Sequence, residues 1–207
     1  MKPQVDISNY QGIKYDSKER FINYWNQINS VIKIKPLKVL EIGVGNGFVS
    51  NYLKKQGIKI ISVDIDSRLK PNFICSVTNL SKKFKPNSFD TVLCCEVLEH
   101  LPFTKFHTAL YEIYSISSKN VILSLPYIAG HIYFSIKLPN LKLLRIDLRI
   151  PFFWRKHKFD GQHYWEIGKK GFSLRTIKKE LSNYFNITKI FYPLEDKDHL
   201  FFILEKK

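Results

Sequence analysis

Cysteine and methionine are scarce in this chain of 207 residues. It contains three cysteines, Cys75, Cys94 and Cys95, and one methionine. An odd cysteine count, with two adjacent residues and no C-x-x-C pair, excludes a disulfide framework and a zinc knuckle and indicates a reducing compartment. As a group, the cysteines are expected to be small apolar core residues.

Long hydrophobic runs are also missing. The opening stretch MKPQVDISNYQG lacks the apolar segment of a secretory signal. The longest apolar region, residues 121–136, is shorter than the roughly 20 residues that a membrane span needs, and Pro126, Gly130 and His131 interrupt it. The sequence therefore predicts no transmembrane helix and a cytoplasmic location.

Acidic residues are few compared with basic ones. Lysine and arginine number 33 against 18 acidic residues, which gives a formal net charge of +15. Such a surface attracts nucleic acid, anionic membranes or phosphorylated substrates, although a lysine-rich source organism would explain it equally well. With 44% hydrophobic and 14% aromatic residues, the chain can bury a sizeable core, and its length predicts one domain over residues 1–207.

Apolar runs alternate with helical patterns along most of the chain, which predicts an α/β protein with a mostly parallel sheet covered on both faces. The expected helices are 16–32, 47–56, 104–116 and 173–184, and the expected strands are 38–42, 59–63, 73–75, 89–94, 120–125, 187–192 and 200–204. The last two strands flank the short turn PLEDKD, residues 193–198, so they should be antiparallel.

The pattern divides the domain into four segments. A helical segment, 1–35, precedes a core, 36–126; a basic and aromatic cap, 127–172, precedes the final helix and strands, 173–207. In the first helix, Asp16 and Glu19 have the spacing of a capping box. The residues expected on buried helix faces are Phe21, Tyr24, Trp25, Ile28 and Ile32 in the first helix, and Val49, Tyr52 and Leu53 in the second.

Three glycines interrupt the stretch VLEIGVGNGFVSNYL, residues 39–53, between a strand and a helix. Gly43, Gly45 and Gly47 form a backbone cradle whose amides can face an anionic group of a ligand. A dinucleotide fold requires G-x-G-x-x-G, but the position of its third glycine is occupied by Phe48.

Other candidate site residues stand at the ends of the neighbouring strands. The second strand ends at Asp64, followed by Ile65; the third is followed by Ser76 and Val77, and the fourth by Cys95 and Glu96. Because ligands of doubly wound sheets bind beyond the carboxyl ends of the strands, these residues are expected to meet Glu41 and the glycines at one crevice.

Three stretches together carry a family resemblance. EIGVGNG, VDID and FDTVLCCEVLEHLP, in this order and at these strand ends, resemble the motifs of class I S-adenosylmethionine-dependent methyltransferases, over roughly residues 39–126. The overall sequence, including the stretch HYWEIG, is similar to that of bacterial methyltransferase-domain proteins of the type-11-like group. The resemblance implies a Rossmann-like, three-layer, doubly wound sheet of about seven strands, with one antiparallel strand near the C-terminus.

The resemblance also implies a role for each of these strand-end residues in binding S-adenosyl-L-methionine. The glycine loop would lie against the methionine portion, Glu41 would orient it directly or through water, and Asp64 would hold the ribose with Ile65 beside it. Ser76 and Val77 would contact adenine, although many relatives carry an acidic residue at the place of Ser76. Cys95 and Glu96 would form the floor near the sulfonium.

Two histidines are candidates for a general base, which is needed only when the acceptor must lose a proton. They are His100, in LEHLP, and His163, in FDGQHYWEIG, where Tyr164 and Trp165 are candidates for an aromatic wall. The fourth strand is followed by CEVLEH and not by the N/D-P-P-Y motif of base-methylating relatives, so base N-methylation has no motif here.

The segment 131–159 is strongly basic and rich in apolar residues. Its cations are Lys137, Lys142, Arg145, Arg149, Arg155, Lys156 and Lys158, with Asp147 as the one acid. Such a segment can lie on an anionic membrane, as a peripheral contact at the inner face, or line a pocket for a phosphorylated or lipid-linked acceptor, or form a lid with a lysine-rich outer face.

The expected function is O-methylation of a small-molecule or lipid-linked, glycan-type acceptor, with no metal ion. An RNA methyltransferase is an alternative that the charge favours but no recognition motif supports. A methyltransferase-like protein that binds without turnover is a second alternative, and a nicotinamide-dependent oxidoreductase is a third that Phe48 disfavours.

Overall fold

A seven-stranded sheet forms the centre of the molecule, a computed structural model that describes residues 5–10, 12, 15–140, 143–193, 196 and 198–207. The strand order is β3-β2-β1-β4-β5-β9-β8. The strands are β1 (Val39–Ile42), β2 (Ile60–Asp64), β3 (Phe73–Ile74), β4 (Phe89–Cys95), β5 (Ser117–Pro126), β8 (Phe185–Phe191) and β9 (His199–Lys206). Pairing is parallel from β3 through β5, and β9 is antiparallel to both β5 and β8. The predicted sheet, with its one antiparallel strand, is confirmed.

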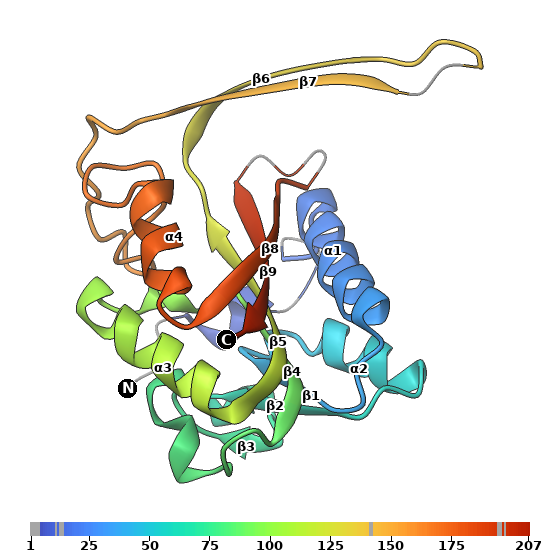
Figure 1. The fold of residues 1–207 in the computed structure, drawn as a ribbon, viewed down its shortest axis with the longest axis vertical. Helices are drawn as coiled ribbons and strands as arrows, with labels where there is room; N and C mark the ends of the chain where they lie inside the picture. Colours follow the sequence, from blue (N-terminus) through green and yellow to red (C-terminus); the bar gives the residue numbers. More distant parts are fainter. Residues whose placement is uncertain (1–4, 11, 13–14, 141–142, 194–195, 197) are drawn as a thin grey trace.

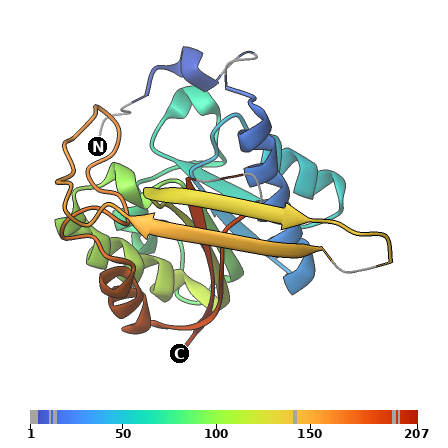
Figure 2. The ribbon, with the colours of Figure 1, turned by 90° about the horizontal axis from the view of Figure 1, so that it is seen from above.

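Helices cover both faces of this sheet (Figures 1 and 2). One face packs on α1 (Lys18–Ile34) and α2 (Phe48–Lys55), which bury Val31 and Leu53 against the sheet. The other packs on α3 (Phe106–Ile116) and α4 (Leu174–Ser182), through residues such as Leu110 and Leu181. Short 3₁₀ turns connect these elements: η1 (Ile7–Tyr10), η2 (Ser67–Leu69), η3 (Val77–Lys82), η4 (Leu98–His100) and η5 (Phe103–Lys105).

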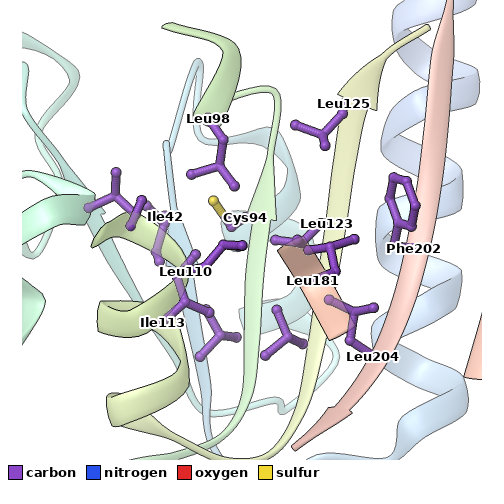
Figure 3. Close-up of a cluster of buried hydrophobic side chains, with 14 of the residues drawn as sticks. Ile42, Cys94, Leu98, Leu110, Ile113, Leu123, Leu125, Leu181, Phe202 and Leu204 are labelled. Carbon is purple, nitrogen blue, oxygen red and sulfur yellow. The ribbon is translucent and has the colours of Figure 1, made fainter. Parts of the chain in front are cut away.

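The central strand β5 shows why the sheet forms as it does. Its residues from Val121 to Leu125 are all buried, as expected for a strand that has helices on both faces. In Figure 3, Leu123 and Leu125 lie among side chains from α3, α4 and β9. Burying a Leu side chain stabilises a fold by roughly 1.5–3 kcal/mol, so this continuous core holds the strand ends in fixed positions.

The predicted beginning and apolar face of the first helix need correction. Its N-cap is Ser17, whose hydroxyl accepts a hydrogen bond from the Arg20 amide at 3.3 Å, and not the predicted box of Asp16 and Glu19. Tyr24 and Ile28 are buried as predicted. Four residues expected to point inward are more than a third exposed because the helices contact the sheet along narrower stripes: Phe21, Trp25 and Ile32 in α1 and Tyr52 in α2.

The cap segment contains a regular element that the sequence analysis did not predict. Strands β6 (Ala129–Ile136) and β7 (Leu144–Pro151) form an antiparallel two-stranded ribbon that projects past the body of the molecule (Figures 1 and 2). Three cross-strand pairs, Ile132–Leu148, Phe134–Ile146 and Ile136–Leu144, alternate with more polar pairs, so one face of the ribbon is apolar. All six of these side chains are exposed.

Some predictions fall outside the described residues. They concern Lys142, the side chain of Arg145 and part of the PLEDKD turn. Within the described ranges, no helix has both the length and the apolar character required to cross a membrane.

Candidate active site

A cavity of about 1030 Å³ lies at the carboxyl ends of β1, β2 and β4. It opens where the connections from β1 and β4 leave the sheet in opposite directions, which is where doubly wound sheets bind ligands. Its volume is at the upper end of the ~300–1,000 Å³ typical of ligand sites. The predicted site residues that line it are Glu41, Gly43, Gly45, Asp64, Ile65, Ser76, Val77, Cys95, Glu96, His100 and His163.

The glycine loop approaches its neighbours too closely for side chains. Gly43, Gly45 and Gly47 all have positive φ, at 83°, 53° and 77°. A Cβ on Gly43 would lie 2.3 Å from Cγ2 of Val97, in the loop after β4. Gly47 does not line the cavity; it is the N-cap of α2 and turns the chain into that helix. Backbone of Gly43 and Gly45 therefore forms the cavity wall.

Asp64 ends β2 with its carboxylate held by backbone amides. Its two oxygens accept hydrogen bonds from the amides of Val44, at 3.0 Å, and Asp66, at 2.9 Å. Burial raises the pKa of Asp64, and these amides oppose that rise. Since an ionised carboxylate offers about four acceptor positions, half of its capacity remains for a ligand in the cavity.

The turn after β3 lies beside Asp64. The Ser76 hydroxyl is the N-cap of η3, where it accepts from the Thr78 amide at 3.3 Å and pairs with the Thr78 hydroxyl at 2.9 Å. The Ser76 hydroxyl therefore has little hydrogen-bonding capacity left for a ligand. Val77 is buried and Ile65 half-buried, so this end of the cavity is largely apolar.

Glu41 and Cys95 also line the cavity. Burial raises the pKa of Glu41 to about 8, and its Oε2 has no hydrogen-bond partner among the described residues. Burial also raises the pKa of the Cys95 thiol, which is therefore protonated at neutral pH. A buried carboxyl oxygen without a partner costs free energy unless a ligand or water satisfies it, so Oε2 of Glu41 is suited to form a hydrogen bond with a ligand.

Glu96 belongs to an ion-pair network that the sequence analysis missed. Its Oε2 lies 2.6 Å from Nη1 of Arg20 on α1 and 3.5 Å from Nε2 of His199 on β9, and His199 in turn pairs with Asp196 at 2.8 Å. Burial would raise the pKa of Glu96, but His199 and Arg20 outweigh it and lower that pKa to about 2. No sequence spacing connects residues 20, 96 and 199, so only the fold reveals this cluster.

His100 and His163 meet in the cavity. Their ring centroids are 5.1 Å apart, although the residues belong to η4 and to the loop before α4. Beside them, Glu99 is 1% exposed, and burial raises its pKa to about 7. Both histidines were predicted from the sequence as candidate site residues, whereas Glu99 was not.

The predicted aromatic wall is wrong for both of its members. Trp165 is fully buried and packs on Phe103, Phe106 and Phe172, while its Nε1 donates to the Leu101 carbonyl at 3.0 Å. Neither Trp165 nor Tyr164 lines the cavity. The ring of Trp165 instead fixes the loop that carries His163.

The N-terminal segment covers the cavity, which the sequence gave no pattern to predict. Tyr10, Tyr15, Arg20 and Tyr24 all line it. Arg20 lies over the Tyr15 ring at 4.7 Å, so its ion pair with Glu96 joins this cover to the cavity floor.

The fold and the glycine loop define a class of protein. A sheet of this order carries a G-x-G-x-G turn after β1 and a carboxylate at the end of β2, the arrangement that the resemblance to class I S-adenosylmethionine-dependent methyltransferases implies. Residues 40–125 match the family model described as a methyltransferase domain. Over this part of the chain, the match confirms the methyltransferase class predicted from the three motifs.

Curated relatives are similar over part of the chain. The ubiquinone biosynthesis O-methyltransferase of Aliivibrio fischeri is 28% identical over 78 residues, which are 31% of this chain and 33% of that protein. The enzyme of the same description from Xanthomonas campestris is 24% identical over 132 residues, 48% of this chain and 55% of that protein. The chain thus spans about a third to a half of the length of these relatives.

Solved structures are similar over nearly the whole fold. A Burkholderia thailandensis 1,6-didemethyltoxoflavin-N1-methyltransferase, with S-adenosylhomocysteine bound, has a TM-score of 0.64 at 16% identity, over 97% of this chain and 85% of that one. The magnesium protoporphyrin IX methyltransferase of Synechocystis PCC 6803, with S-adenosylmethionine bound, has a TM-score of 0.60 at 17% identity, over 97% and 88%.

Proposed function

We propose that this protein transfers the methyl group of S-adenosylmethionine to an oxygen atom of a small or lipid-linked acceptor. The observation that carries the proposal is the convergence of the glycine loop, Asp64 and Glu96 on one cavity large enough for a nucleoside cofactor and a second molecule. The O-methyltransferase descriptions of the curated relatives support oxygen as the acceptor atom.

In this proposal the cofactor lies across the strand ends. Asp64 accepts hydrogen bonds from the ribose hydroxyls, and Ile65, Ser76 and Val77 contact the adenine. The methionine portion lies along Gly43 and Gly45, with Gly47 setting the turn. Glu41, Cys95 and Glu96 form the floor below it, where the unsatisfied Oε2 of Glu41 is available to a hydrogen-bond donor of the ligand.

The chemistry requires alignment above all. A lone pair of the acceptor oxygen attacks the methyl carbon, the carbon–sulfur bond breaks, and S-adenosylhomocysteine leaves with the bonding electrons while the acceptor hydroxyl loses its proton. Holding the two molecules in line can contribute ~7–11 kcal/mol to lowering the barrier. His100 and His163 line the part of the cavity proposed for the acceptor and are the candidates to assist the loss of that proton.

Titration calorimetry with S-adenosylhomocysteine and NADH tests the cofactor. Binding of S-adenosylhomocysteine with a micromolar Kd, and no heat with NADH, is the expected result. Incubation of the protein with methyl-labelled S-adenosylmethionine and a panel of phenols and alcohols then tests transfer to oxygen. Clean titration with NADH alone would contradict the proposal, and label found on amines but not hydroxyls would contradict the acceptor atom.

An anionic phospholipid surface is the proposed partner of the ribbon β6–β7. Six side chains of its apolar face are exposed, including Ile132, Phe134 and Leu148. Exposed cations follow at Arg155, Lys156 and Lys158, and the net charge of +15 favours an anionic partner. A membrane contact of this kind would bring a lipid-linked acceptor near the cavity.

Vesicle sedimentation tests this partner. The protein is expected to bind vesicles containing phosphatidylglycerol and to bind pure phosphatidylcholine several-fold more weakly. Replacing Phe134 and Leu148 by Ser should remove most of the binding because both belong to the apolar face. Tyr133→Ser, on the other face of the same strand, is the matched control. Equal binding by all variants, or a dimer in light scattering that the Phe134 and Leu148 changes dissociate, would refute the membrane contact.

A further inference from the structure

Three side chains in the part of the cavity proposed for the acceptor have the arrangement of a metal site. Glu99, His100 and His163 each offer one ligand atom, and these atoms all lie within 4.8 Å of one another. Glu99 and His100 belong to η4, directly after the sheet, whereas His163 comes from a loop more than 60 positions away. All three line the large cavity.

The fold fixes these two segments against each other. The Tyr164 amide donates to the Glu99 carbonyl at 2.9 Å, and Trp165 Nε1 donates to the Leu101 carbonyl at 3.0 Å. Since Trp165 is fully buried, the loop cannot move away from η4 without opening the core. The three ligand groups are therefore held together before any ligand arrives, as a binding site requires.

The outer contacts of both histidines match those of metal ligands. Nδ1 of His100 lies 3.0 Å from the Gln162 carbonyl, and Nδ1 of His163 lies 2.9 Å from Oε1 of Glu166. Metal-binding histidines commonly donate one ring N–H to a carbonyl or carboxylate, which fixes the ring and its tautomer. Binding through Nε2 would leave both of these bonds intact.

Glu99 provides an independent observation. Its side chain is buried, with the residue 1% exposed, and Oε2 has no hydrogen-bond partner within the part of the chain that the structure describes. An unsatisfied buried carboxyl oxygen costs roughly 1–3 kcal/mol or more. A cation shared with the two imidazoles would satisfy it.

We propose that Glu99, His100 and His163 bind a divalent transition-metal ion, such as Zn²⁺ or Mn²⁺, beside the methyl-transfer site. Two imidazoles and one carboxylate suit these ions better than Mg²⁺, and three protein ligands leave a coordination position open, as in catalytic sites. The binding of the ion does not depend on the proposed function. The catalytic role of the bound ion rests on that function, because an acceptor hydroxyl bound to the ion would lose its proton more readily.

A second grouping shares His163 but is less suitable. Asp160, His163 and Glu166 also place ligand atoms within 4.8 Å. However, Asp160 already accepts from the amides of Gln162 and His163, at 2.9 and 2.7 Å. Glu166 is ion-paired with Lys169, whose positive charge would repel a metal ion. The Glu99 grouping is therefore the one proposed.

Metal titration tests the site without any assay of activity. The protein, first dialysed against a chelator, is titrated with ZnCl₂ and MnCl₂ by calorimetry, and bound metal is counted after equilibrium dialysis. One equivalent is expected, and Co²⁺ should give a d–d absorption spectrum. Glu99→Gln and His163→Asn should each weaken binding at least 10-fold, and Glu166→Gln, which frees the His163 ring, about 10-fold.

The controls separate this site from its alternatives. His107→Asn changes an exposed histidine on α3 that contacts Tyr184, and it should leave the metal affinity unchanged. Asp160→Asn should also leave it unchanged; loss of binding there would assign the second grouping and overturn this one. Should Glu99→Gln fail to fold, as judged by circular dichroism, His100→Asn replaces it.

Parallel titrations with S-adenosylhomocysteine distinguish failure of the metal site from failure of the proposed function. If the unchanged protein binds the nucleoside but no metal, or binds metal equally in every variant, the metal site is wrong and the methyltransferase proposal stands. If metal binds as expected but the nucleoside does not, the metal site stands and its proposed role is wrong.

Discussion

Asp64→Asn is expected to weaken the binding of S-adenosylhomocysteine about 100-fold. The Asp64 carboxylate is held by the amides of Val44 and Asp66 and has acceptor capacity left for two ribose hydroxyls. A hydrogen bond to a charged group contributes ~1.5–3 kcal/mol, so losing the charge and one acceptor oxygen costs about 2.7 kcal/mol, which is about 100-fold in Kd. Titration calorimetry measures the change.

The matched control is Asp90→Asn. Asp90, near the start of β4, also accepts from two backbone amides, those of Leu37 at 2.7 Å and Lys38 at 2.6 Å. It lies at the opposite end of the sheet from the cavity and does not line it. The control should therefore lose stability but keep its affinity. Unchanged affinity in Asp64→Asn would remove that residue from the site.

Gly43→Ala is expected to lower the free energy of unfolding by about 2–5 kcal/mol. A non-glycine residue at a φ of 83° costs roughly 1–2 kcal/mol, and a Cβ placed 2.3 Å from Val97 Cγ2 adds roughly 1–3 kcal/mol of overpacking. Urea unfolding, followed by circular dichroism, measures the difference. Cofactor binding should fall as well, because the same backbone forms the cavity wall.

Gly57→Ala separates the cost of the backbone conformation from the cost of the clash with Val97. Gly57 has a similar φ of 80°, but an added Cβ would meet nothing within 4 Å. This variant should show the backbone cost alone, about 1–2 kcal/mol. Adding Val97→Ala to Gly43→Ala should recover part of the loss by removing the clash. Equal destabilisation by Gly43→Ala and Gly57→Ala would show that the contact with Val97 can relax.

The strand ends were predictable because their signals are local. An apolar run followed by Asp64 or by Cys95 and Glu96 identifies the strand and, to within one residue, its end, and parallel pairing then brings these ends together. The same reasoning could not find Arg20 or His199, which reach Glu96 from a helix and from the antiparallel strand. Their positions depend on packing that no periodicity encodes.

The cap segment shows a different limit. Alternation at Ile132, Phe134 and Ile136 is present in the sequence, but an alternating strand is normally assigned a core to bury its apolar face. Here that face is exposed, so the usual link between period and burial does not hold. Trp25 on α1 shows the same limit, since an apolar helical position is 61% exposed.

The position of β9 has a consequence for the order of folding. β8 precedes β9 in the chain, yet it joins the sheet only through β9, which lies between it and β5. The parallel half, β1 to β5, can assemble from successive neighbours, whereas β8 must wait until the later strand is available. We therefore expect the parallel half, β1 to β5, to form first during refolding. The hairpin of β8 and β9 should dock in a slower, later phase, because non-local strand pairings generally form slowly.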